Sequence, residues 1–135
     1  MQTKRSLTVL PMPSTSFRHE VGFAAPEDGQ AQILFEVERG GAWFATGLQF
    51  DGACAFSHRT ESRCTEWYVD GIYDRLVEVV NSAWVAELNS VYVSHFAFPG
   101  RTPTQVHHYM IYLDSVGAFE VVAESWSWLS EEPVD

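Results

Sequence analysis

The sequence predicts a β-rich α+β protein, in which about six to seven short strands form a rolled or two-layer antiparallel sheet with one short helix. Stretches that alternate apolar and polar residues recur along the chain, and turns containing Gly or Asp separate them. The short helix is expected over residues 83–88. Because the chain has 135 residues, of which 46% are hydrophobic, we expect one domain with one core.

The expected domain occupies residues 31–129, between two less regular ends. Residues 1–30 hold three of the six prolines and show no sustained period, so we expect an irregular N-terminal arm with one short strand near residues 18–23. Residues 130–135 are acidic and are expected to fray.

A meander of three strands is expected at the start of the domain. The first strand has apolar residues at every second position from Ile33 to Val37. Gly40-Gly41 and Asp51-Gly52 then mark tight turns, because glycine adopts the positive φ angles that such turns require. The strands are expected over residues 33–38, 43–50 and 53–59.

Residues 66–80 fit both a helix and a strand. A helix would place four acidic residues on one face, since they are spaced four apart from Glu66 to Glu78. Gly71 and the β-branched valines at 77, 79 and 80 favour a strand instead, and we expect one over residues 73–80. Ser82 is then expected to cap a short helix over residues 83–88.

The last third of the domain is expected to contain a strand over residues 91–96, a projecting loop around residues 99–103, and a hairpin. The hairpin strands are residues 108–113 and 118–125, joined by a type I turn over residues 114–117. Both hairpin strands carry apolar residues on both faces and contain no lysine, arginine or proline. We therefore expect the hairpin at the centre of the sheet.

The net charge of -10 is unevenly distributed. From Glu66 onward there are 11 acidic residues against two arginines, whereas residues 1–65 are nearly neutral. A negative field repels phosphate backbones and anionic membranes and attracts basic surfaces. We therefore expect a basic protein partner, no nucleic acid and no membrane, particularly since no stretch approaches the ~20 apolar residues of a membrane span.

Two cysteines, Cys54 and Cys64, are too few for the disulfide framework of a secreted domain. We expect both to be free thiols that serve as small buried hydrophobes. No apolar run resembles a signal peptide, which favours a cytoplasmic location.

Three strings in the last half of the chain carry a resemblance. They are Tyr73-Asp74-x-Leu76-Val77-Glu78-Val79, Ser82-x-Trp84-Val85, and His108-Tyr109-Met110-Ile111-Tyr112-x-Asp114-Ser115-x-Gly117, which runs on to Glu120-Val121-x-Ala123-Glu124. They resemble small uncharacterised bacterial proteins, some of which are immunity or accessory proteins. The resemblance implies a bacterial cytoplasmic binding protein and names no reaction.

Five acidic residues are the expected partner-binding residues: Glu66, Asp70, Asp74, Glu78 and Glu87. Their charge would steer a basic toxin or enzyme toward the protein and pair with its Arg or Lys side chains. A solvated face that only aids solubility is the alternative for the same residues. We expect a non-enzymatic binding module of the immunity or inhibitor type, without a cofactor.

The alternative function is a small ligand-binding or enzymatic β-barrel. Its pocket would combine histidines with aromatic side chains, and the candidate residues are His58, His95, His108, Tyr112 and Trp126. A histidine on an apolar strand is, however, usually a core residue bonded to a neighbour. Trp126 and Trp128 share strand parity and would form either a surface platform with Phe98 or Tyr112 or the end of the core.

One cluster combines a thiol, an imidazole and carboxylates: His58, Glu61, Cys64 and Glu66. These groups would suit nucleophilic catalysis only if they met in the fold, and closeness along a polar loop does not establish that. We expect no catalysis there.

The remaining histidines suggest a metal site formed by His95, His107 or His108 with Asp114, since imidazole and carboxylate are common zinc or iron ligands. Adjacent residues of a strand point to opposite faces, so only one of His107 and His108 would face such a site. We expect no metal.

Overall fold

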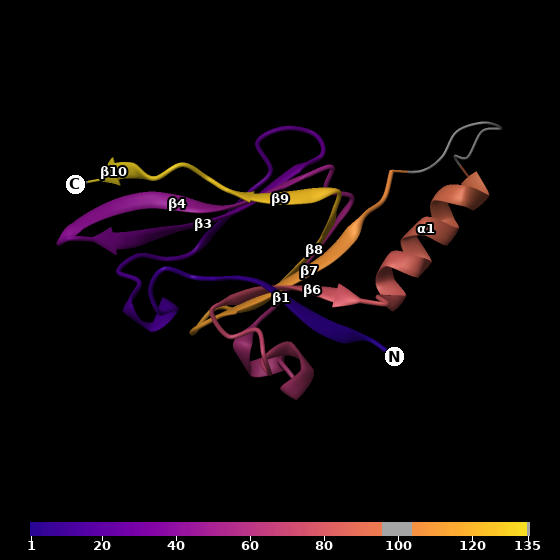
Figure 1. Ribbon diagram of the computed structural model, residues 1–135, viewed down its shortest axis with the longest axis horizontal. Helices are drawn as coiled ribbons and strands as arrows, with labels where there is room; N and C mark the ends of the chain where they lie inside the picture. The colour runs from indigo at the N-terminus through magenta and orange to yellow at the C-terminus, as the bar shows by residue number, and fades with distance from the viewer. Residues whose placement is uncertain (96–103, 135) are drawn as a thin grey trace.

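The computed structural model describes residues 1–95 and 104–134, which form two antiparallel sheets and one α-helix (Figure 1). The β-rich class with one helix is confirmed for these residues, but they contain ten strands, so the expected six to seven is wrong. The strands are β1 (Thr3–Val9), β2 (Gly22–Ala24), β3 (Gln30–Arg39), β4 (Ala42–Asp51), β5 (Ala55–Arg59), β6 (Arg75–Val80), β7 (His107–Leu113), β8 (Gly117–Ala123), β9 (Ser125–Trp128) and β10 (Glu132–Val134). The helical elements are η1 (Ser14–Ser16), η2 (Glu61–Arg63), η3 (Glu66–Tyr68) and α1 (Ala83–His95).

The first sheet has the strand order β1-β6-β7-β8-β5. The β7–β8 hairpin therefore lies in its interior, as predicted, with β7 at the centre. Its turn differs from the expected type I turn, because Ser115 has a φ of 62°. The strand expected over residues 73–80 is also confirmed as β6, although it begins at Arg75, and Gly71 with a φ of 75° is incompatible with an α-helix that leads into it.

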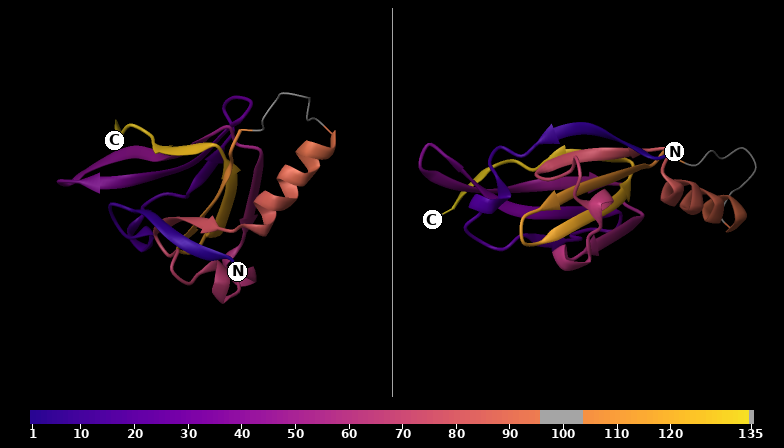
Figure 2. Two further views of the ribbon diagram at one scale, coloured as in Figure 1. Left: turned by 45° about the vertical axis from the view of Figure 1, so that its right-hand side comes forward. Right: turned by 90° about the horizontal axis from the view of Figure 1, so that it is seen from below.

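The second sheet has the order β10-β4-β3-β2, with β9 also paired to β4. The chain crosses between the sheets twice at one corner, from β4 to β5 and from β8 to β9 (Figure 2). At this corner the Glu124 N–H donates to the Asp51 carbonyl at 2.9 Å. Gly52 has a φ of 63° here, and a Cβ on it would lie 2.3 Å from the Glu124 side chain. Glycine at this position thus allows the two crossings to lie together.

The core lies between the two sheets, where alternate residues of each strand face inward. Strand β3 contributes Ile33, Phe35 and Val37, as its alternating pattern predicts. The hairpin contributes the inward residues Tyr109, Ile111, Leu113, Phe119, Val121 and Ala123.

The outer face of the first sheet is covered as well. A second apolar cluster there includes Met110 and Tyr112 of β7, and Trp67 and Tyr68 of η3 pack against it. Helix α1 lies at one end of the sheets and extends away from them (Figures 1 and 2). The space beside its first turn is where the candidate site lies.

Helix α1 is longer than predicted, and the strand expected over residues 91–96 is wrong as far as His95. The half-buried side chains of Trp84, Leu88 and Tyr92 recur every four residues, as expected for one face of a helix. The run around residue 91 also alternates apolar with polar residues, which is why it resembles a strand. The loop expected around residues 99–103, and Phe98, lie outside the described residues.

The two chain ends are more regular than predicted. The prediction of an irregular arm over residues 1–30 is wrong for β1, which pairs with β6 as an edge strand. The prediction of a frayed tail over residues 130–135 is wrong for β10, which pairs with β4. As an edge strand, β1 carries the charged residues Lys4 and Arg5, and four of its seven residues are exposed, so its sequence shows no apolar alternation. Among the described residues, no helix has both the length and the apolar character needed to cross a membrane.

Candidate functional site

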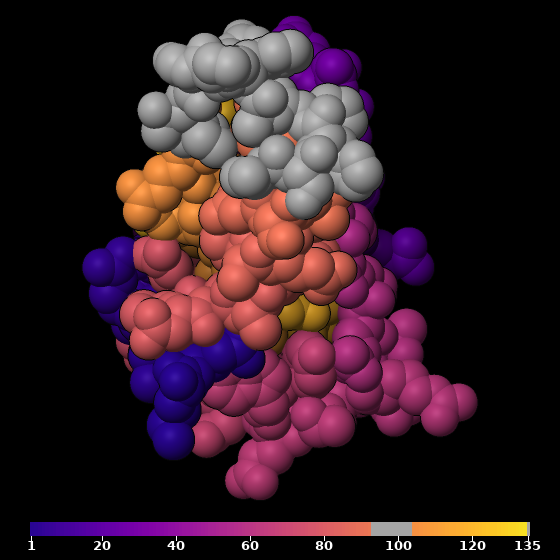
Figure 3. Space-filling model, turned by 90° about the vertical axis from the view of Figure 1, so that its right-hand side faces the viewer, coloured from indigo at the N-terminus to yellow at the C-terminus, as the bar shows by residue number. Residues whose placement is uncertain are grey.

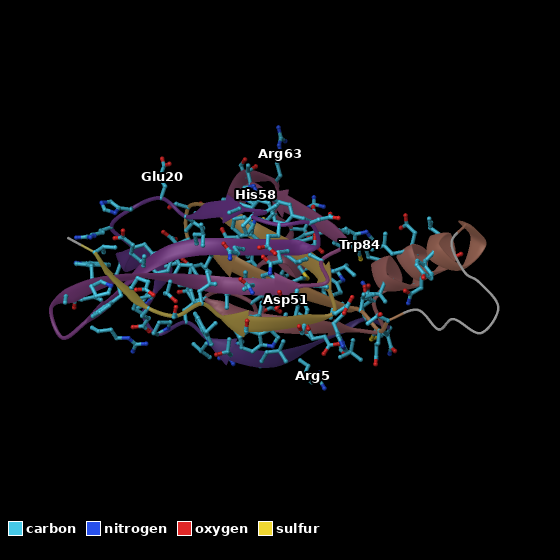
Figure 4. All side chains as sticks on the ribbon, turned by 90° about the horizontal axis from the view of Figure 1, so that it is seen from above. Arg5, Glu20, Asp51, His58, Arg63 and Trp84 are labelled. Atoms are coloured by element: carbon cyan, nitrogen blue, oxygen red, sulfur yellow. The ribbon has the colours of Figure 1, made fainter. Side chains whose placement is uncertain are left out.

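A pocket of about 330 Å³ lies on the outer face of the first sheet, between helix α1 and helix η3. We call it the His108 pocket, and the side chains that define it are His108, Glu120, Trp67, Tyr68, Trp84 and Glu87. Figure 3 looks onto this side of the molecule and shows yellow atoms of the late chain between α1 and the magenta segment near residue 65. Figure 4 places Trp84 where helix α1 meets the sheets.

The hairpin register brings two polar residues of this pocket, His108 and Glu120, together. His108 lies opposite Val122, and Glu120 lies opposite Met110, so His108 and Glu120 are diagonal neighbours on the outer face. Long side chains reach across such a diagonal. His108 Nε2 lies 2.8 Å from Glu120 Oε1, and both residues are buried, at 5% and 9% exposure.

Ser82 extends this pair into a three-residue hydrogen-bonded chain. Its Oγ lies 2.7 Å from His108 Nδ1 and also accepts the Val85 N–H at 3.1 Å, so Ser82 caps helix α1 as predicted. The Glu120 carboxylate can only accept, so His108 Nε2 donates to it. With this tautomer of the neutral imidazole, Nδ1 accepts from the Ser82 hydroxyl.

Cations of the same chain already lie over two aromatic rings of the pocket. Lys4 Nζ is 4.1 Å from the centre of the Trp67 ring, and the Arg59 guanidinium is 4.0 Å from that of Tyr68. Burial lowers the pKa of Lys4, against the opposing effect of Asp70. Trp84 instead meets the His108 ring edge-on, with 5.3 Å between ring centres.

The five predicted partner-binding acids have two different environments. Asp74 and Glu78 are half-buried and already paired: Asp74 accepts from the N–H and hydroxyl of Ser14, and Glu78 binds Arg5 and His107. The other three are exposed, and of these Glu87 lines the His108 pocket, while Glu66 and Asp70 lie in or next to η3. The structure thus does not bring the five together on one open face.

The predicted ligand-pocket residues are also dispersed among the described elements. His58 on β5 stacks on Phe119 at 4.5 Å and binds the Val116 carbonyl, away from Trp84 in Figure 4. Tyr112 shares the outer face of β7 with His108, but its hydroxyl donates to Glu61 at 2.8 Å.

Two residues of that set lie farther from the pocket in the fold. Trp126 belongs to the second sheet, where it is half-buried against the core and meets Trp128 edge-on. Trp128 is 37% exposed. His95 is the last residue of helix α1 instead of a strand residue.

The proposed nucleophile cluster does not form a Cys–His pair. The Cys64 thiol donates to the carbonyls of Arg59 and Thr60, while His58 binds a carbonyl elsewhere. Both cysteines are free, as predicted, but their expected burial is wrong, since Cys54 is exposed and Cys64 half-buried. Burial of the Cys54 thiol by its neighbours nevertheless raises its pKa.

No group of three metal-ligating side chains lies together in residues 1–95 and 104–134. His107 and His108 point to opposite faces of β7, since His107 binds Glu78 and His108 binds Ser82 and Glu120. Asp114, the fourth candidate ligand, accepts a hydrogen bond from the Tyr73 hydroxyl at 2.6 Å.

Comparisons of the chain with protein families, curated proteins and solved structures give no match.

Of the residues that define the pocket, the sequence predicts His108 and Glu87 as site residues, and it leaves Trp67 and Trp84 open between a binding surface and the core. It does not predict Glu120. The available signal is that Glu120 is an acidic residue inside an otherwise apolar hairpin strand, where a carboxylate is costly to bury unless it is paired. The sequence predicts Ser82 only as a helix cap.

Proposed function

We propose that this chain is a protein-binding module of the immunity or inhibitor type, whose His108 pocket accepts an Arg or Lys side chain of a basic partner protein. One observation carries the proposal: two carboxylates, Glu87 and Glu120, share a small pocket with three aromatic rings. Cationic side chains bind both carboxylates and aromatic faces.

Trp84 is the ring that we assign to the partner. Lys4 and Arg59 already lie over the other two rings, and no cation of the described chain lies over Trp84. An incoming guanidinium at Trp84 would have Glu87, one turn further along the same helix, as its carboxylate.

The charge distribution supports the same partner class. Glu66 and Asp70 are exposed beside the pocket, and the net charge of -10 attracts a basic surface over a Debye length of about 8 Å at physiological salt. We also propose a cytoplasmic location, which the two free thiols support.

A tri-arginine peptide titrated against the intact chain, with tryptophan fluorescence as the readout, tests the pocket directly. We expect binding that weakens between about 0.02 and 0.2 M salt and falls roughly 5-fold in Glu87→Gln, since one exposed carboxylate contributes up to about 1 kcal/mol. Glu20→Gln is the matched control, because Glu20 is also exposed but lies far from Trp84 (Figure 4).

Equal binding of tri-glutamate, or equal affinities of the Glu87→Gln and Glu20→Gln variants, would contradict the proposal. Purification of the protein with its native partners extends the test. The expected complex contains a basic protein and dissociates as salt is raised, and a partner that remains bound at high salt through an apolar surface would contradict the assignment.

A further inference from the structure

Ser82 lies at a tight strand-to-helix junction. Strand β6 ends at Val80, Asn81 has a φ of 58°, and helix α1 begins at Ala83. A serine held at such a junction presents its hydroxyl at the positive end of the helix dipole.

The first turn of α1 has one N–H donor left over. The N–H of Ala83 donates to Gln2 Oε1 at 2.8 Å, that of Val85 to Ser82 Oγ, and that of Ala86 to the Ser82 carbonyl. No acceptor for the Trp84 N–H is found in the described part of the chain. The Trp84 N–H is therefore not used by the first turn of the helix.

The partners of Ser82 exceed what a helix cap requires. A cap needs only an oxygen that accepts from the first turn, and Ser82 Oγ meets that need through Val85. His108 and Glu120 continue the chain into the sheet, although burying a carboxylate there is costly compared with an apolar residue. The order hydroxyl, imidazole, carboxylate is that of a nucleophile, its base and the group that orients the base.

We propose that Ser82 is a nucleophile for acyl transfer, with His108 as its general base and Glu120 as a positioning residue. This goes beyond the proposed partner binding, because Ser82 lines a different hollow of about 320 Å³, which His108 lines as well. We call it the Ser82 pocket, and its apolar wall consists of Val79, Val80, Val85, Ala86 and Val106. The substrate class is an uncharged ester with a short acyl chain, since this pocket is small and the chain repels anions.

The reaction balances with water as the second reactant. The Ser82 oxygen forms a bond to the acyl carbon while its proton passes to His108 Nδ1, and the carbonyl oxygen becomes an oxyanion at the N-terminal end of helix α1. The bond between carbon and the leaving alcohol oxygen then breaks, and that oxygen takes the proton from Nδ1. Water hydrolyses the acyl-serine by the same steps in reverse, and Glu120 stabilises the imidazolium in each half of the reaction.

Two probes test the intact chain: a fluorophosphonate and p-nitrophenyl acetate. Attack on the fluorophosphonate forms an Oγ–P bond and releases fluoride with the proton, so we expect one adduct per chain, on the peptide that contains Ser82. We expect p-nitrophenyl acetate hydrolysis to fall at least about 100-fold in Ser82→Asn, which keeps a helix-capping side chain but has no nucleophile. Ser130→Ala, at an exposed serine, is the control and should react as the native chain does.

Glu120→Gln distinguishes a positioning role from a purely structural one. We expect it to lower kcat at least about 10-fold with little change in KM, because an amide cannot stabilise the imidazolium in the same way. Absence of an adduct on Ser82 in the native chain, or native rates in Ser82→Asn, would overturn the proposal. If Ser82→Asn does not fold, the adduct on the native chain alone decides.

Discussion

Replacing Ile111 by Ala should remove a large part of the free energy of unfolding. Ile111 is 1% exposed, faces the core between the two sheets, and lies opposite Phe119 in the central hairpin. The change removes about three carbon groups at ~0.8 kcal/mol each and leaves a cavity, so we expect a loss of roughly 2–5 kcal/mol. A typical domain has only about 5–15 kcal/mol in total.

Urea unfolding followed by tryptophan fluorescence measures this loss as a lower midpoint with an unchanged slope. The melting temperature should fall by roughly 10–20 °C. Val91→Ala is the control, because Val91 is 49% exposed on helix α1 and its replacement should cost under about 0.5 kcal/mol. If the two variants unfold at the same urea concentration, the hairpin is not the centre of the core. Ile111→Asp should not fold at all, since it buries an unpaired carboxylate.

Three further predictions concern a turn, two phenols and a thiol. Gly117→Ala should destabilise the protein by about 2 kcal/mol or more, because Gly117 has a φ of 113° and a Cβ there would lie 2.0 Å from a backbone oxygen of β5. Gly41→Ala is the control, because a Cβ at Gly41 would meet no atom within 4 Å. Its loss of stability in urea unfolding should be clearly smaller. The hydrogen bond to a carboxylate raises the pKa of Tyr73 to about 12, and burial raises the pKa of Tyr109 to about 12. The stability that these two neutral phenols contribute is therefore complete below pH ~10 and is lost as pH rises toward 12. Tyrosinate absorbance should show fewer phenols titrating near pH 10 in the native chain than in the denaturant-unfolded chain, and equal numbers would contradict this. Iodoacetamide should alkylate Cys54 more slowly than free cysteine at neutral pH, because burial raises its pKa, and an intact mass two hydrogens short would show instead a disulfide.

The sequence predicts best those elements whose pattern has one physical cause. The hairpin is recognisable because apolar residues on both faces of both strands leave a central position as the only stable one. Ser82 marks the start of helix α1 because a hydroxyl there satisfies a free N–H. Strand β1 is missed because its charged residues suit an edge, where alternation is not required.

The candidate site is harder to predict because tertiary contacts create it. His108 meets Ser82 and Glu120 across separations of 26 and 12 residues, and no spacing rule connects the three. For the five predicted partner-binding acids the error is of the opposite kind, because the sequence groups residues that the fold separates. Asp74 and Glu78 share a charge pattern with Glu66, but the fold pairs them internally, which the sequence pattern does not reveal.

The two pockets meet at His108, so the two proposals make a joint prediction. A guanidinium bound at Glu87 in the His108 pocket would also approach Glu120 and compete for its carboxylate with His108 Nε2. The imidazolium formed during acyl transfer would then be less stabilised, so tri-arginine should slow the reaction of Ser82 with the fluorophosphonate. By linkage, a phosphonylated Ser82 should bind tri-arginine with correspondingly changed affinity. In Glu87→Gln the slowing should require a higher peptide concentration. If tri-arginine slows the fluorophosphonate reaction equally in the native chain and in Glu87→Gln, or does not slow it while the peptide is bound, the two pockets act independently.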